Sequence, residues 1–167
     1  FDAVSRLSPR QAASRLWGDR HVVALDGDDT LFPMEAISFD EYFGSRIQSG
    51  ALWHLHWDPH HLNRDFRGAM RLYLNADDLD FMTRIRDQDP VMLQALLSDV
   101  IFQMCSHALL DEDAHVFLHE PEPGTVAHQI SGWLKTAFGH IPAARLRSTL
   151  EARPGEFRTA ILAISRV

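Results

Sequence analysis

The sequence predicts an α+β fold: a small, mainly antiparallel sheet packed by helices, with a helix-rich C-terminal part at about residues 124–167. Three observations support this prediction. The 167 residues fit a single domain spanning residues 1–167. Strand-like stretches occur in neighbouring pairs in the first half of the chain. Helix start and stop signals gather in the second half, and paired strands followed by clustered helices are typical of α+β proteins.

The first third of the chain mixes helix and strand signals. A serine and proline at 8–9, followed by Gly18, predict a short helix with a cap, a first-turn proline and a terminating glycine. Ser38 and Glu41 form a capping box, which predicts a helix that runs to about residue 48. Between these two helices, apolar stretches predict the strands His21–Leu25 and Thr30–Met34.

Three further strands are predicted in the remaining apolar stretches. Residues 51–57 alternate strictly, so that Ala51, Trp53, Leu55 and Trp57 share one face while the histidines share the other. Residues 69–74 and 115–118 are the other two predicted strands.

The strongest helix signal begins at Asp89-Pro90 and covers residues 91–110. Fourteen of these 20 residues are apolar, which predicts the central buried helix. Thr125 caps a later helix that Gly139 ends. Shorter helices are predicted at 77–86, 142–152 and 156–165.

The composition indicates a soluble globular domain. Apolar residues make up 46% of the chain, and no apolar stretch reaches the roughly 18 residues that cross a bilayer. Cys105 is the single cysteine, so no internal disulfide forms and a reducing, cytoplasmic compartment is expected. Because Cys105 lies among apolar residues, its thiol is expected to be buried and not catalytic. Phe1 is not a natural start, so we expect a piece of a longer protein.

The charge is unevenly distributed. Residues 1–134 carry 10 arginines and 21 acids, a net charge of −11, whereas residues 135–167 carry 6 basic residues and 2 acids, a net charge of +4. The acidic body disfavours nucleic acid as a partner and favours electrostatic steering of a basic protein. The basic C-terminal part is expected either to contact an acidic partner or to fold back on the acidic body.

An acidic segment, Asp26-Gly27-Asp28-Asp29-Thr30, follows an apolar stretch and has two interpretations. It resembles the first motif of haloacid-dehalogenase-type phosphatases. That resemblance implies that Asp26 is the nucleophile, Asp28 the general acid and Thr30 the residue that orients the loop, with Mg²⁺ as cofactor. The pair Asp77 and Asp78 would then imitate the late acidic pair of that family.

The second interpretation of the same segment is a hairpin turn. Asp26-Gly27 is a strong turn dipeptide, and apolar residues flank it on both sides. We prefer the turn, because it accounts for the segment without the second motif and the alternating strand–helix order that the phosphatases require.

A histidine cluster is the other chemical feature. On a strand, His54, His56 and Asp58 would point the same way, and His60 or His61 could close a shell around Zn²⁺ after the bend at Pro59. The string loosely resembles the His-x-His-x-Asp-His motif of metallo-β-lactamase-type hydrolases, with one extra residue before His60. The alternative is a strand whose histidines face solvent.

No complete catalytic set is present in the sequence. We therefore expect a non-catalytic accessory or regulatory domain that binds another protein. The two alternatives are a Mg²⁺-dependent phosphatase or phosphotransferase that uses Asp26 and Asp28, and a metal-binding protein that uses His54, His56 and Asp58.

Overall fold

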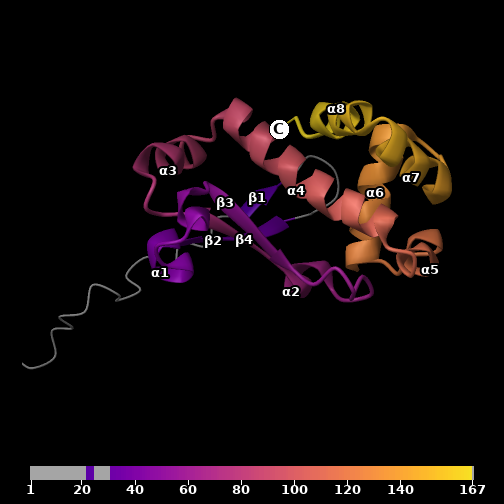
Figure 1. The fold of residues 1–167 in the computed structure, drawn as a ribbon, viewed down its shortest axis with the longest axis horizontal. Helices are drawn as coiled ribbons and strands as arrows, with labels where there is room; N and C mark the ends of the chain where they lie inside the picture. Colours follow the sequence, from indigo (N-terminus) through magenta and orange to yellow (C-terminus); the bar gives the residue numbers. More distant parts are fainter. Residues whose placement is uncertain (1–21, 25–30, 167) are drawn as a thin grey trace, which may run out of the picture.

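The computed structural model describes residues 22–24 and 31–166 (Figure 1). It confirms the α+β prediction and the helix-rich C-terminal part, where residues 126–138, 143–152 and 154–164 are helical. The predicted helix at 8–18 and the segment Asp26–Thr30 lie outside the described residues. Within them the order is β1 Val22–Ala24, β2 Leu31–Ile37, α1 Phe39–Phe43, the 3₁₀ helix η1 Ile47–Gly50, β3 Trp53–Trp57, α2 Phe66–Ala69, β4 Met70–Asn75, α3 Leu79–Arg86, α4 Pro90–Leu110, α5 Ala114–His119, α6 Val126–Phe138, α7 Ala143–Ala152 and α8 Pro154–Ile164.

The four strands form a mixed sheet in the order β1-β2-β4-β3. β1 pairs antiparallel with β2, and β3 pairs antiparallel with β4, as the sequence predicts. β2 and β4 pair in parallel, which the sequence does not predict. A parallel pair needs a crossover, and here α1, η1, β3 and α2 provide it.

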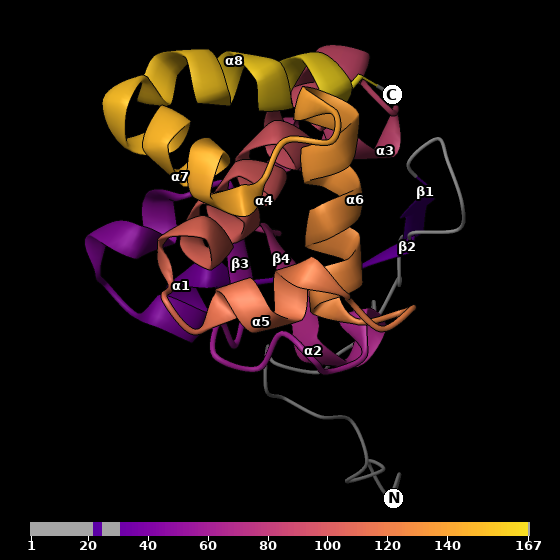
Figure 2. The ribbon, with the colours of Figure 1, turned by 90° about the vertical axis from the view of Figure 1, so that its right-hand side faces the viewer.

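Helix α4 is the centre of the molecule. It packs against α3, α5, α6, α7 and α8, and crosses one face of the sheet (Figures 1 and 2). Trp53 on β3 donates an indole hydrogen bond of 2.8 Å to Asp99 on α4. α4 is long and apolar enough to span a membrane by length and composition. However, 56% of its most apolar stretch is buried inside the fold, as expected of a core helix.

A three-ring contact joins the sheet to the helical part. Phe32 on β2 is fully buried and stacks on Trp133 of α6, with ring centroids 5.8 Å apart. Phe66 on α2 meets both rings edge-on, at 5.6 and 5.9 Å. These contacts belong to one connected apolar core that links the sheet and the helices.

A second aromatic group lies on the face of the sheet away from α4. Tyr42 and Phe43 of α1 contact His54 of β3, and Tyr42 also contacts Tyr73 of β4. Phe39 is fully buried beneath them and meets Phe43 edge-on. The predicted alternation in β3 is therefore confirmed, because Trp53 faces α4 while His54 faces α1.

Two sequence predictions are wrong in detail. The helix expected up to about residue 48 ends at Phe43, because Gly44 adopts a φ of +66° and turns the chain away. Residues 115–118 lie in the helix α5 and not in a strand. Ala114 and Leu118, four residues apart, turn toward the core in that helix, while Val116 between them is 77% exposed.

Candidate functional site

Asp77 and Asp78 stabilise helix starts in this structure. Asp77 Oδ2 accepts hydrogen bonds from the Ser38 hydroxyl and the Asp40 backbone N–H, both at 3.0 Å, at the start of α1. Asp78 caps α3, where its side chain accepts from the Phe81 N–H at 2.9 Å. Both carboxylates thus satisfy backbone donors that a helix start leaves without partners.

The strand directions keep this acidic pair away from the end of β1. Ala24, the last described residue of β1, pairs with Leu31, whereas Asn75 pairs with Ile37 at the other end of β2. Six residues of strand span roughly 20 Å. Asp26, Asp28 and Thr30 lie outside the described residues. The antiparallel pairing of β1 and β2 agrees with the hairpin interpretation, and the strands do not bring Asp77 and Asp78 to the end of β1.

The histidine cluster divides into two parts. His54 and His56 are on the face away from α4, with ring centroids 6.4 Å apart. His54 stacks on Tyr73 and meets Phe43 edge-on. Partial burial lowers the pKa of His54, and the nearby His56 lowers it further. These contacts favour the neutral imidazole at neutral pH.

The second part of the cluster lies in the loop after β3. Asp58 accepts from the His60 N–H at 3.0 Å and contacts His61 Nδ1 at 2.6 Å. The backbone bond and then the His61 ring lower the pKa of Asp58. The His60 ring lies instead beside Asp111, with His60 Nδ1 3.7 Å from Asp111 Oδ2. The predicted ligands are therefore engaged in separate contacts. Across residues 22–24 and 31–166, no three His, Cys, Asp or Glu side chains are grouped so that they could hold a metal ion.

Cys105 is fully buried in α4, and burial raises the pKa of its thiol. The thiolate required for nucleophilic attack is therefore disfavoured, which confirms the expectation of a structural cysteine.

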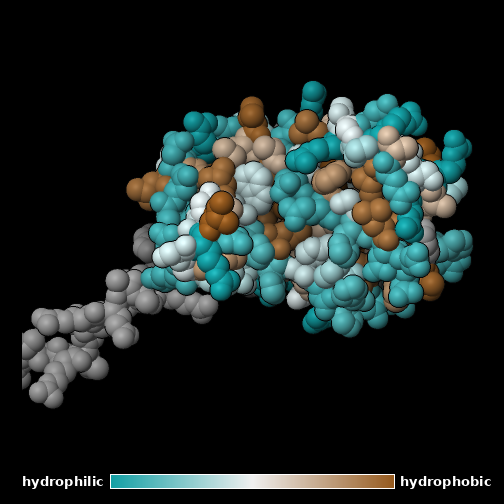
Figure 3. Space-filling view, in the orientation of Figure 1, coloured by the Kyte–Doolittle hydropathy of each residue, from teal (hydrophilic) through white to brown (hydrophobic). Residues whose placement is uncertain are grey.

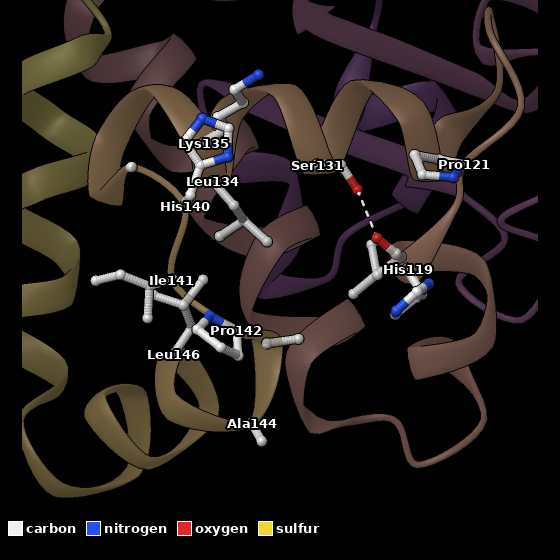
Figure 4. Close-up of a pocket in the computed structure, with 13 residues that line it drawn as sticks. His119, Pro121, Ser131, Leu134, Lys135, His140, Ile141, Pro142, Ala144 and Leu146 are labelled. Carbon is white, nitrogen blue, oxygen red and sulfur yellow. Dashed lines mark hydrogen bonds between the residues drawn. The ribbon is translucent and has the colours of Figure 1, made fainter.

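A groove of about 800 Å³ lies between α5, α6 and α7, and we call it the helical groove. Its apolar residues include Leu118, Leu134 and Leu146, one from each helix. In Figure 4, Leu134 points from α6 toward the loop that carries Ile141 and Pro142. Ile141 is 42% exposed, so an apolar side chain remains accessible at this groove.

The polar residues of the helical groove are basic or neutral. Lys135, His119 and His140 line it, and no acidic residue does. The Lys135 ammonium makes no ion pair with any residue that the structure describes. Ser131 donates to the Leu118 carbonyl at 3.4 Å, so its hydroxyl is not activated by either histidine. The groove therefore combines apolar walls with basic side chains: Lys135 makes no ion pair with a described residue, and His119 Nδ1 lies 4.0 Å from Glu120 Oε1. Among the described residues, Ser131 forms no hydrogen bond with either histidine.

The sequence prediction did not include this groove, although part of its signal was visible. Residues 135–167 carry a net charge of +4. The structure shows that α7 and α8 pack on α4, where Arg158 Nη2 lies 3.7 Å from Asp99 Oδ1. This is the alternative in which the basic C-terminal part folds back on the acidic body. The space-filling view, in the orientation of Figure 1, shows hydrophobic groups among hydrophilic side chains on the side that faces the viewer (Figure 3).

Comparisons with known proteins found no matching family model, no similar curated protein and no similar solved structure.

Proposed function

We propose that this domain is a non-catalytic accessory or regulatory module that binds another protein through the helical groove. The observation that carries the proposal is the accessible apolar groove of about 800 Å³ with Lys135 and two histidines along it. A volume of this size accepts several side chains of a partner segment, and apolar contact supplies most of the binding free energy in such grooves.

The charge of the groove selects the occupant. The overall charge of −7 favours a basic partner at long range, but eight of the thirteen residues that line the groove lie in the basic part of the chain. Lys135 makes no ion pair with a described residue, so a carboxylate from the partner would neutralise it. The proposed occupant is therefore an acidic amphipathic helix of another protein, with its apolar face on Ile141 and the partly exposed Leu118. Its acids lie toward Lys135 and His140.

A fluorescently labelled helical peptide with leucines at i, i+4 and i+7 and glutamates elsewhere tests this proposal. Anisotropy should report saturable binding that weakens as salt is added, because exposed charge pairs are screened. Ile141→Ser and Lys135→Glu should each weaken binding about tenfold, equivalent to about 1.4 kcal/mol.

The matched control is Leu162→Ser on α8. Leu162 and Ile141 are both 42% exposed, but Leu162 does not line the groove. It should leave the affinity unchanged. Equal binding of a peptide with lysine in place of glutamate, or equal losses in Leu162→Ser and Ile141→Ser, would contradict the proposal.

A further inference from the structure

A second cavity, of about 580 Å³, lies at the end of the β3–β4 pair, and we call it the sheet-end cavity. It shares no lining residue with the helical groove. Its volume is within the range of small-molecule sites, about 300–1,000 Å³. Five of its ten lining residues are ionisable: His56, Asp58, Arg64, Arg71 and Tyr73. This cavity is thus much richer in polar chemistry than the helical groove.

The strand register places three of these side chains together. His56 pairs directly with Arg71 across β3 and β4, and Tyr73 lies two residues further on the same face of β4. The His56 and Tyr73 rings are 6.2 Å apart. An imidazole, a guanidinium and a phenol therefore line the cavity from neighbouring positions on one face of the strand pair.

Arg71 is held in a fixed position by its own backbone surroundings. Its Nη1 donates to the Arg67 carbonyl at 2.7 Å and to the Met70 carbonyl at 2.8 Å. Neither bond involves an acid, and the positive charge of Arg71 makes no ion pair with a described residue. No described residue accepts a hydrogen bond from the other N–H groups of this guanidinium, so they can donate to an anion.

Arg64 adds a second positive charge from the loop between β3 and α2. Its guanidinium also makes no ion pair with a described residue. Asp58 is the acid that lines the cavity, and both of its oxygens already accept hydrogen bonds from His60 and His61. Two arginines therefore line one cavity without an ion pair to any described carboxylate, although residues 1–134 hold 21 acids and 10 arginines.

We propose that the sheet-end cavity binds a small phosphate ester. The phosphoryl oxygens are received by Arg71 and Arg64, with His56 and the Tyr73 hydroxyl as further donors. A tetrahedral phosphate presents enough oxygens for donors that come from several directions, and guanidinium groups bind it through paired hydrogen bonds. Because the cavity is larger than one phosphate group, its remaining space holds the organic part of the ligand against Trp57 and Pro59.

Phenyl phosphate is the probe for this site, followed by calorimetry and by amide chemical shifts in ¹⁵N-labelled protein at constant ionic strength. We expect saturable binding in the roughly millimolar range or tighter, with the shifts confined to β3, β4 and the loop between β3 and α2. Arg64→Gln should weaken binding tenfold or more. The Arg64 side chain makes no hydrogen bond with a described residue, so this variant breaks no such bond. A loss of binding would therefore report the loss of the guanidinium from the cavity.

Arg71→Lys keeps the charge and removes the fork, so it should also weaken binding. Arg46→Gln is the control, because Arg46 is exposed and does not line the cavity. The proposal is overturned if phenyl phosphate does not saturate, if Arg46→Gln weakens binding as much as Arg64→Gln, or if phenylacetate binds more tightly than phenyl phosphate. None of these outcomes depends on the helical groove.

Discussion

The helical groove and the sheet-end cavity both have basic side chains in their linings, but the other lining residues differ. Lys135 of the groove and Arg64 and Arg71 of the cavity make no ion pair with a described residue. The groove combines its basic residues with leucines, whereas the cavity combines them with hydrogen-bonding groups. Three helices frame the groove, and its accessible apolar residue Ile141 is the contact point for the proposed partner helix. A strand pair fixes side chains at short, regular intervals, which suits the directional donors of a small-ligand site.

The two regions share one core, so a break at their junction tests whether they are separable. Phe32 is fully buried and contacts Phe66 and Trp133. We expect Phe32→Ala to lower the free energy of unfolding by about 3–5 kcal/mol in urea denaturation, because it leaves a cavity between sheet and helices.

The control for this substitution is Phe117→Ala. Phe117 is 37% exposed on α5, so its truncation should cost much less. If far-ultraviolet dichroism and tryptophan fluorescence of the Phe32 variant report separate transitions, the two regions are independent units and the single core is contradicted.

A smaller break is available where α4 crosses β3. Trp53→Phe removes the 2.8 Å bond to Asp99 but keeps an aromatic ring, so we expect a loss of about 1 kcal/mol in the free energy of unfolding. Trp57→Phe is the matched control on the same strand, because Trp57 contacts His107 only through its ring. Equal losses in the two variants would contradict a role for the indole hydrogen bond.

The elements that sequence reasoning could predict are those with local signals. Thr125 accepts from the His128 N–H and Gly139 ends α6 with a φ of +73°, as their residue types predict. Asp89 likewise accepts from two backbone N–H groups at the start of α4. Each of these signals depends on a few neighbouring residues, so no tertiary contact is needed to interpret it.

The candidate sites depend on contacts that are distant in the sequence. The helical groove needs Leu118, Leu134 and Leu146 to meet, and these come from three helices. The sheet-end cavity needs the exact register of His56 with Arg71, and a slip of one residue would turn the histidine to the other face. The acidic pair at 77–78 was interpretable as the late acidic pair of a phosphatase because the sequence does not show that its oxygens cap helices.

The capping role of Asp77 predicts a modest effect on stability. Asp77→Ala removes the acceptor for Ser38 and Asp40, and we expect a loss of about 0.5–1 kcal/mol in the free energy of unfolding. Asp87→Ala is the control, because its side chain makes no hydrogen bond within the described structure. A Mg²⁺-dependent phosphatase activity that Asp77→Ala abolishes without a change in stability would contradict the capping role.

The smallest expected effect concerns pH and the sheet face that carries the sheet-end cavity. Partial burial and the neighbouring His56 lower the pKa of His54 from 6.5, so the folded state takes up its proton at lower pH than the unfolded state does. The contribution of neutral His54 to the free energy of unfolding is therefore fully present above pH 6.5. It is lost as the pH falls from 6.5 toward the folded-state pKa.

The variant His54→Phe keeps a ring between Phe43 and Tyr73 and cannot titrate. Melting temperatures from pH 7.5 to 5 should fall less steeply for this variant than for the wild type. The control for the loss of an imidazole is His128→Gln, at an exposed position on α6. Parallel curves for wild type and His54→Phe would show that the proton affinity of His54 does not change on folding, and the sheet face would then contribute geometry but no pH dependence.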